Sequence, residues 1–349
     1  GVTKVELGVQ HLDNGVLAFN RREMTAEAVA AGSEMLRDYG FKVVYHMMPN
    51  LPTSTPEMDV LMFKNLYDGL DHHPDMMKIY PNMVLKGSLL YKLVTQKKID
   101  YTAYSDELLT RVLADCESYV PNYTRLIRVI RDIPADYIII GSKKSNLRED
   151  VDKYQKARGV QQVDIRAREI RDAEVDPNDF ELTETWYETR HAFECFLQFE
   201  NKNENKLAGF LRLRLPKKDS NYNSSSTLTS VQSDANWGIK KWKEESLQFE
   251  KDKLSKTDAY QIDDLLSDSA LVRELHVYGT MKRVGEEGNQ SQHTGMGKKL
   301  LARAEEIARG GNQHNLKYKK LTIISGVGVR EYYKKRGFTL QNTYMVKSL

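Results

Sequence analysis

The sequence predicts an α/β protein built of two parts, each with a sheet of its own. In the first part, strand-like and helix-like runs alternate across residues 5–131 and are joined by short links. Such alternation is typical of βαβ units on a parallel sheet or barrel. In the second part, residues 207–216 alternate in polarity like a strand with one buried face. The length of 349 residues also suits about two domains.

The elements expected in the first part follow one another closely. Residues 5–9 predict a buried strand, and residues 25–39 predict a helix that Thr25 caps and Gly40 ends. Three or four such strand–helix units make a partial barrel rather than a complete one. The other elements expected before residue 143 are strands at 41–48, 76–80 and 123–131 and helices at 57–70 and 106–119.

The pattern changes in the middle of the chain. Residues 143–200 predict polar helices and short strands, with a basic stretch at 166–171. Residues 217–266 are rich in Ser, Asn, Lys and Asp, which predicts a polar insertion with a charged helix around 238–252 and no assigned function. The expected domains are residues 1–142, 143–200 and 201–349.

Composition excludes several classes of protein. No apolar run reaches the roughly 18 residues that a membrane span needs. The 52 basic and 49 acidic side chains give a net charge of +3, so a nucleic-acid partner would need a local basic patch. The two cysteines, Cys116 and Cys195, exclude a disulfide framework and a cysteine-ligated cluster within this chain, and they fit a reducing compartment. Because the chain opens on a strand-like run without Met, we expect the back part of a longer protein.

The strongest local motif lies between a predicted strand at 271–277 and a predicted helix at 298–309. It runs Gln-His-Thr-Gly-Met-Gly over residues 292–297. Gly295 and Gly297 let the backbone turn tightly with its N–H groups outward, and the helix adds the positive end of its dipole. The motif therefore predicts an anion site, for example for a pyrophosphate. A strand-to-helix turn without a ligand is the alternative that this motif alone leaves open.

Three side chains near this motif are candidates for chemistry. Tyr332 and Tyr333 lie about 100° apart on a predicted helix and so face different surroundings. The purely structural interpretation packs one of them in the core and exposes the other. His276 lies on the strand before the motif, where a single His is more often structural than a base. Beside a thioester, it would act as a proton acceptor.

The order of elements in about the last eighty residues resembles the GNAT acetyltransferases. After the glycine motif come a helix, a buried strand at 321–324, a short helix at 331–337 and a final strand. In that family a loop of type Gln-x-x-Gly-x-Gly cradles the pyrophosphate of acetyl-CoA, and the preceding strand hydrogen-bonds the pantetheine arm. A Tyr of the later helix lies near the thioester sulfur, where a phenol can donate a hydrogen bond to the leaving thiolate.

Nearly the whole chain, except the insertion at 217–266, resembles the family of catalytic subunits of Elongator. The resemblance is carried by several motifs that occur in the order typical of that family. These are Val5-Glu-Leu-Gly-Val-Gln10, His46-Met-Met-Pro49, Lys78-Ile-Tyr-Pro81, Arg131-Asp-Ile-Pro134, Asn146-Leu-Arg148, Asp164-Ile-Arg-Ala-Arg-Glu169, Leu271-Val-Arg-Glu-Leu-His-Val-Tyr-Gly279, Gln292-His-Thr-Gly-Met-Gly297, Ile323-Ile-Ser-Gly-Val-Gly328, Arg330-Glu-Tyr-Tyr-Lys-Lys-Arg-Gly-Phe338 and Tyr344-Met-Val-Lys347.

The resemblance implies a partial radical-SAM (β/α) barrel followed by a GNAT acetyltransferase-like α+β domain. The family uses acetyl-CoA and S-adenosylmethionine to place a carboxymethyl group on carbon 5 of the wobble uridine of tRNA. Its 4Fe-4S cluster is held by three cysteines that precede the point where this chain starts. The implied partners are the tRNA anticodon stem-loop and other Elongator subunits, with no membrane.

Carried over residue by residue, the resemblance also implies a set of site residues. Acetyl-CoA would lie along the strand before the glycine motif, and its pyrophosphate would lie on the motif and the helix start. Tyr333 would contact the CoA sulfur or the acetyl end, with Tyr332 in support, and Lys78 would face the radical side. The coenzyme residues are Glu274, Leu275, His276, Val277, Gln292, Gly295, Met296, Gly297 and Lys298, and His276, Tyr332 and Tyr333 are the catalytic candidates.

Arg166 and Arg168 are the main candidates for contacts to tRNA phosphates, and the other basic candidates are Arg125, Arg128, Arg131, Arg148 and Arg171. Arg166 and Arg168 are expected to share one strand face, and pairing with neighbouring acids is the alternative to RNA contact. No metal is expected here, because some prokaryotic relatives carry zinc-ligand cysteines where this chain has Asp164 and Ala167.

Three functions are compatible with these residues. The first is the tRNA uridine carboxymethyltransferase subunit, and the second is a protein lysine acetyltransferase that uses the GNAT domain alone. The third is a tRNA-binding scaffold without turnover, which the intact glycine motif and the tyrosine pair argue against.

Overall fold

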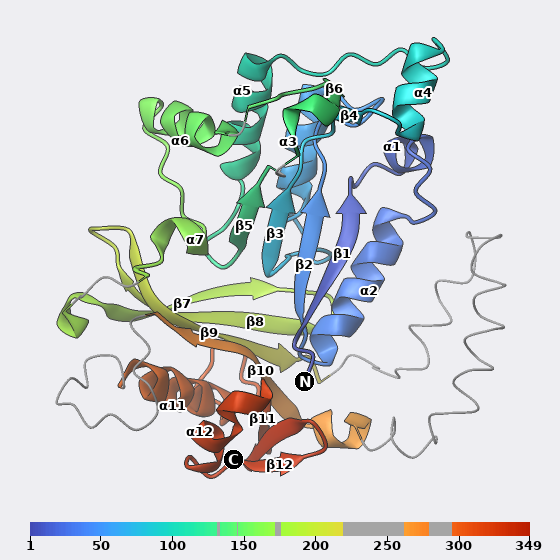
Figure 1. Cartoon of the computed structure of the whole chain (residues 1–349). Helices are drawn as coiled ribbons and strands as arrows, with labels where there is room; N and C mark the ends of the chain where they lie inside the picture. Colours follow the sequence, from blue (N-terminus) through green and yellow to red (C-terminus); the bar gives the residue numbers. More distant parts are fainter. Residues whose placement is uncertain (131–132, 145, 172–175, 219–261, 279–294) are drawn as a thin grey trace, which may run out of the picture. The chain divides into compact units, whose positions relative to one another are not determined.

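The computed structural model of the chain contains two compact units (Figure 1). Unit 1 consists of Gly1–Val5, Ala31–Lys42 and Arg168–Leu349, and unit 2 consists of Glu6–Ala30 and Val43–Ala167. The structure describes all residues except 131–132, 145, 172–175, 219–261 and 279–294.

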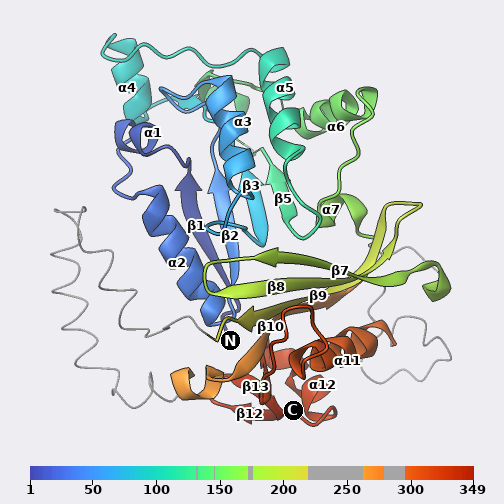
Figure 2. The same ribbon diagram turned by 180° about the vertical axis from the view of Figure 1, so that it is seen from behind.

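Unit 2 is built around a four-stranded sheet with the strand order β1–β2–β3–β5. β2 pairs with β3, and β3 with β5, in parallel, as the alternation of strands and helices predicts. Helices α3 and α5 lie on one face of the sheet, in front of it in Figure 2. The strands are β1 (Lys4–Gln10), β2 (Lys42–Met47), β3 (Met76–Ile79) and β5 (Arg125–Val129), and β4 (Val84–Leu85) forms an antiparallel pair with β6 (Ile138–Ile140). The helices are α1 (Asn14–Phe19), α3 (Pro56–Asn65), α4 (Leu89–Thr95), α5 (Asp106–Glu117), α6 (Leu147–Ala157) and α7 (Ile165–Arg168), with a short 3-10 turn at Ala135–Tyr137. Helix α2 (Ala26–Asp38) begins in unit 2 and belongs to unit 1 from Ala31 onward.

The helix starts of this unit follow from local capping chemistry. The Thr55 hydroxyl accepts a hydrogen bond from the Met58 amide at the start of α3, and Pro56 occupies the first helical position. The Ser105 hydroxyl accepts a bond from the Leu108 amide at the start of α5. Both helices therefore begin within one residue of the predicted starts.

The two faces of the four-stranded sheet differ in polarity. Tyr45 and Met77 are fully buried on one face. Their neighbours, His46 and Lys78, point to the other face and are partly exposed, because successive side chains of a strand alternate between faces. Parallel sheets are usually apolar on both faces, so the polar face is a departure from the rule.

Unit 1 is built around a seven-stranded sheet with the order β12–β13–β11–β10–β9–β8–β7. All its pairs are antiparallel except β10–β11, which is parallel. Helix α11 packs against β8, β9, β10 and β11, and α12 lies beside it in both views (Figures 1 and 2). The elements are β7 (Glu181–Glu188), β8 (Ala192–Asn201), β9 (Lys206–Pro216), β10 (Ser269–Val277), α11 (Met296–Ala308), β11 (Lys320–Ile324), α12 (Arg330–Lys334), β12 (Thr339–Gln341) and β13 (Tyr344–Ser348), with short 3-10 turns at Pro177–Asp179 and Val327–Val329.

The units differ from the three predicted domain ranges. Strands β7 and β8 lie within residues 143–200, which the sequence predicts as a separate subdomain, yet both belong to the sheet of unit 1. Phe196 and Leu197 of β8 are at most 1% exposed, so this strand is part of the core. Residues 31–42 also pack with unit 1, because buried ion pairs join the end of α2 to β8 and β9.

Two further predictions differ from the structure or lie outside it. Arg166 and Arg168 were expected on a strand but lie on the short helix α7, where they do not share a strand face. Most of the predicted insertion at 217–266, including the charged helix around 238–252, lies outside the described residues. No helix among the described residues is long and apolar enough to cross a membrane.

Candidate functional site

The central feature of unit 1 is a point at which two parallel strands part. β10 pairs with β11 from Ser269 to Val272 and then continues to Val277 along β9. The register of β10 on β9 shifts between Val272 and Glu274, which marks an irregularity where the parting begins. Beyond Val272, the β11 side of β10 has no partner among the described strands. Backbone groups along such an edge can pair with an amide-bearing ligand.

The first turn of α11 has the character of an anion site. Gly295 is the N-cap, and no side chain caps the helix there. The first N–H groups of a helix lack partners within it and carry the positive end of its dipole. Lys298 and Lys299 are exposed in this turn, and the turn contains no acidic residue. An added anion would therefore relieve an unfavourable concentration of positive charge.

Three elements meet at Gly297. A Cβ atom added there would lie 3.5 Å from Val277 Cγ2, at the end of β10, and 3.0 Å from the hydroxyl of Tyr332, on α12. The absence of a side chain at Gly297 is what allows this close approach. The structure thus brings together the strand, the helix start and one of the tyrosines predicted for the coenzyme. Gln292, predicted for the same loop, lies outside the described residues.

The two tyrosines of α12 occupy different environments. Tyr333 is 5% exposed, and its ring meets the edges of Tyr332 and Phe338 at centroid distances of 5.2 and 5.9 Å. Burial raises the pKa of Tyr333. Tyr332 is half-buried, and burial raises its pKa as well, although Arg336 opposes that shift. This division matches the interpretation of one packed and one accessible tyrosine.

The predicted residues on β10 differ in their contacts. The Glu274 carboxylate accepts a hydrogen bond from Arg212 Nε at 2.9 Å, and the Arg212 guanidinium lies over the ring of Phe210. His276 is exposed, with its ring centroid 5.8 Å from that of Phe210 and 4.5 Å from that of Tyr278. The sequence analysis did not identify Arg212 as a site residue, because it lies in no recognised motif. The signal that could have drawn attention to it is its position as a charged residue among apolar residues of β9.

Lys78 belongs to a small charged cluster on the polar face of the unit 2 sheet. Its ammonium group donates to Glu6 Oε2 at 2.6 Å, and His46 Nε2 lies 2.8 Å from the same oxygen. Arg128 on β5 is in register with Lys78 and is exposed. Glu6, His46 and Lys78 all occur in the motifs of the family resemblance, but the motifs do not reveal that they meet.

The two arginines that are the main candidates for tRNA contact have protein partners. Arg168 is 3% exposed and lies 3.2 Å from Glu200 and 2.9 Å from the Gln198 side-chain oxygen. Its position favours the alternative of pairing with a neighbouring acid. Arg166 is partly buried and donates to the carbonyl oxygen of Ile127.

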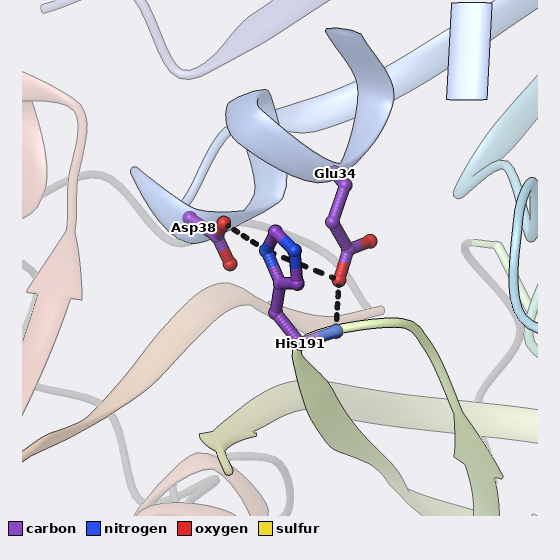
Figure 3. A group of neighbouring side chains, drawn as sticks. All are labelled: Glu34, Asp38 and His191. Atoms are coloured by element: carbon purple, nitrogen blue, oxygen red, sulfur yellow. Dashed lines mark hydrogen bonds and ion pairs between the residues drawn. The ribbon is translucent and has the colours of Figure 1, made fainter. Parts of the chain in front are cut away.

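One group of side chains has the composition of a metal site (Figure 3). Glu34, Asp38 and His191 bring their ligand atoms within 4.8 Å of one another, and His191 Nδ1 lies 2.9 Å from Asp38. However, Arg214 is fully buried beside them and forms ion pairs with both carboxylates. Because a guanidinium already neutralises the acids and repels a cation, this group is better explained as a structural network.

Burial of Glu34 is offset by these partners. Desolvation alone would raise the pKa of its carboxyl group, but Arg214 and Arg37 outweigh it and hold the pKa well below the usual range. The same carboxylate accepts bonds from the His191 amide and the Thr189 hydroxyl. Glu34 is therefore a permanent anion that joins α2 to the sheet of unit 1.

Comparisons with known proteins find relatives that are similar over the whole chain. The model of the radical-SAM C-terminal domain matches residues 74–157. A tRNA uridine(34) acetyltransferase of Methanocaldococcus jannaschii is 36% identical over the entire chain, which covers 57% of that relative, and one of Dehalococcoides mccartyi is 36% identical with 67% covered. Elongator complex protein 3 of Bos taurus is 35% identical, with 56% covered.

The fold agrees with these similarities. The solved structure of archaeal Methanocaldococcus infernus Elp3, lacking residues 1–46, superposes with a TM-score of 0.78 at 35% identity over 100% of this chain and 73% of that one. The chain is an α/β protein in which a radical-SAM-type sheet precedes an acetyltransferase-like sheet. It belongs to the family of Elongator complex protein 3 and the tRNA uridine(34) acetyltransferases. It spans somewhat more than half the length of the first of these relatives.

Proposed function

We propose that this chain is part of the catalytic subunit of an Elongator-like enzyme that modifies the wobble uridine of tRNA. Unit 1 binds acetyl-CoA, whose acetyl group becomes the carboxymethyl substituent on carbon 5 of the base. The observation that carries this proposal is the parting of β10 and β11 beside the first turn of α11. The choice of a tRNA uridine as the substrate is supported by the name of a relative, a tRNA uridine(34) acetyltransferase.

The coenzyme contacts follow from that geometry. The diphosphate lies on the N–H groups at the start of α11, with Met296, Gly297 and Lys298 around it. The pantetheine amides pair with the backbone of β10 from Glu274 to Val277, where this strand has parted from β11. Tyr333 and His276 lie toward the acetyl end, where His276 accepts a proton and the phenol donates to the thiolate. The reacting carbonyl then lies near the point where β10 and β11 part, at the end of the coenzyme arm that is farther from the start of α11.

The radical half of the reaction requires groups that this chain alone does not hold. When bound, S-adenosylmethionine on a 4Fe-4S cluster supplies the radical that activates the acetyl group. Cys116 and Cys195 lie in different units, both are buried, and burial raises the pKa of each thiol, so they do not suit cluster ligation. In this proposal the described chain binds the coenzyme and the tRNA and supplies His276 and Tyr333 at the thioester.

On the tRNA side, the polar face of the unit 2 sheet offers the best contacts. Lys78 and Arg128 supply positive charge there, and Glu6 orients the Lys78 ammonium group. Arg166 is a further candidate for a phosphate, whereas Arg168 is committed to Glu200. Other Elongator subunits complete the proposed assembly in the cytoplasm or nucleus.

The test compares substrates of the acetyl transfer. Calorimetry should detect acetyl-CoA binding by the whole chain, and tRNA rather than a histone-tail peptide should stimulate acetyl-CoA hydrolysis by the full-length protein. Nucleoside mass spectrometry of tRNA from the reaction with reconstituted full-length protein should then reveal 5-carboxymethyluridine. Peptide stimulation without any response to tRNA would favour the lysine acetyltransferase. Absence of coenzyme binding would leave only the scaffold.

Gly297→Ala is expected to weaken acetyl-CoA binding about tenfold or more. The added methyl group would lie 3.0 Å from the Tyr332 hydroxyl, so that either the tyrosine or the helix start must move. Calorimetry on the variant measures the effect. Gly32→Ala is the control, since a Cβ there meets nothing within 4 Å and the residue lies in α2. Equal affinities for the two variants would contradict the packing argument.

A further inference from the structure

Arg336 is held in an unusual way just after α12. Its guanidinium carbon lies 3.4 Å from the centroid of the Tyr332 ring, which is a stacked cation–π contact. Its Nη1 donates to the main-chain oxygen of Tyr332 at 2.6 Å. The hydroxyl of the same tyrosine abuts Gly297 at the start of α11. Tyr332 thus contacts the start of α11 through its hydroxyl and holds the Arg336 guanidinium on the face of its ring. The positive charge of Arg336 is therefore fixed near the candidate diphosphate site.

The hydrogen-bonding capacity of Arg336 is only partly used. Its Nε is buried and has no acceptor within the described part of the chain. None of the ion pairs among the described residues involves Arg336, whereas Lys334 on the same helix pairs with Glu331 at 2.7 Å. The buried Nε is closed to a ligand, but the side chain as a whole is partly exposed and its Nη2 has no acceptor among the described residues, so Nη2 can bind an acceptor from outside the chain.

The surroundings indicate the charge of that acceptor. The start of α11 contributes the positive end of a helix of 13 residues, and Lys298 and Lys299 add two positive side chains without an acid in the turn. The unsatisfied Arg336 and the basic helix start are separate features from different elements. Both are explained by one anionic group between them, and guanidinium is well suited to phosphate oxygens.

We propose that Arg336 binds a phosphate oxygen of the diphosphate of coenzyme A, with Tyr332 as the positioning residue that holds the guanidinium. This inference rests on the proposed function, because it assigns a role within the same coenzyme site. It places the Tyr332 phenol at the diphosphate end of the coenzyme rather than at the acetyl end. The acetyl end is then left to Tyr333 and His276.

The experiment uses calorimetry with the whole chain and three probes: coenzyme A, dephospho-coenzyme A and pantetheine. Arg336→Gln is expected to weaken binding of the first two by about tenfold to a hundredfold, since a charge-assisted hydrogen bond is lost. Pantetheine, which has no phosphate, should bind the variant as it binds the unmodified chain. Lys335→Gln is the matched control, because it removes the same charge from an adjacent exposed residue.

Two further variants test the positioning role. Tyr332→Phe keeps the ring under the guanidinium and should retain most of the affinity for dephospho-coenzyme A. Tyr332→Leu removes the ring and should lower that affinity nearly as much as Arg336→Gln, and combining the two changes should add little. The salt dependence of binding should flatten in Arg336→Gln and Tyr332→Leu but not in Tyr332→Phe. Circular dichroism verifies that each variant is folded.

The possible results separate the two proposals. If the unmodified chain binds none of the probes, both the proposed function and this inference fail. If it binds coenzyme A and Arg336→Gln binds equally well, only this inference fails. A loss confined to coenzyme A would assign Arg336 to the 3′-phosphate and overturn the diphosphate contact. An equal loss for pantetheine would indicate general damage to the site and would also overturn it.

Discussion

Replacing Arg214 with Met is expected to destabilise the protein by about 3–5 kcal/mol. Arg214 is fully buried, lies 2.8 Å from both Glu34 and Glu194, and pairs with Asp38 as well. Methionine fills similar space but leaves three acids without their main counterion. Urea unfolding at pH 7 measures the loss. The pKa of Glu34 should also rise toward neutrality, because its burial then lacks the strongest compensating charge.

The control for this variant is a surface ion pair of similar chemistry. Arg158 pairs with Asp115 at 2.6 Å, and the side chains are 49% and 37% exposed. Arg158→Met should therefore cost about 1 kcal/mol or less. A loss of comparable size in both variants would mean that burial of the network does not set its contribution. A stable Arg214→Met variant would instead show that the network can be replaced by apolar packing.

Replacing Glu117 with Gln is expected to stabilise the protein at neutral pH and to flatten its pH dependence. Burial raises the pKa of Glu117 to about 8, and Asp152 and Asp164 add to the shift against the opposing effect of Arg148. One carboxyl oxygen is buried without a hydrogen-bond partner in the described part of the chain, and the other accepts from Gln162 at 2.9 Å. Glutamine keeps the shape and the latter bond without the titration.

The sign follows from which state holds the proton. The unfolded chain releases it near pH 4.5, whereas the folded chain retains it up to about pH 8. The contribution of Glu117 to stability is therefore complete below pH 4.5 and is lost as the pH rises through 8. The loss is about 1.4 kcal/mol per pH unit between these values, so the variant should gain roughly 3 kcal/mol on the wild type between pH 4.5 and 7.

Thermal unfolding of both proteins from pH 4.5 to 8 measures this difference. Glu149→Gln is the matched control, because it makes the same change at an exposed position of the neighbouring helix α6. Parallel stability curves for the wild type and Glu117→Gln would contradict the assignment, since they would mean that Glu117 is ionised in the folded protein. Convergence of the two curves toward acid pH is the expected signature.

The elements of the fold were largely predictable because their signals are local. The strand at Met76–Ile79, the helix Asp106–Glu117 and the strand Lys206–Pro216 each match their predicted ranges within about three residues. Alternation, caps and turn residues operate over a few positions, and a single sequence contains them. The prediction of a strand around Arg166 and Arg168 was wrong because a short, polar stretch has no such period, and the structure forms helix α7 there.

The candidate site was predictable to the extent that it is contiguous in sequence. Gly295 and Gly297 were located from the glycine motif, and the structure places them at the start of α11. The contact of Gly297 with Tyr332, and the stacking of Arg336 on that ring, could not be predicted, because which tyrosine of a helix faces a distant loop depends on how the helix packs. The burial of Arg168 against Glu200 could not be predicted for the same reason, because it too depends on how distant elements pack.

The sequence by itself determined the class of fold, the position of the glycine motif and the family, because periodicity and short motifs record local conformation directly. Only the tertiary structure decided that residues 31–42 join unit 1, that a buried arginine pairs with Glu34 and Asp38, and that Tyr332 reaches the helix start. Glu34 and Arg214 are 180 positions apart. Ion pairing and close packing at such separations depend on the folded arrangement of the whole chain, which no local pattern specifies.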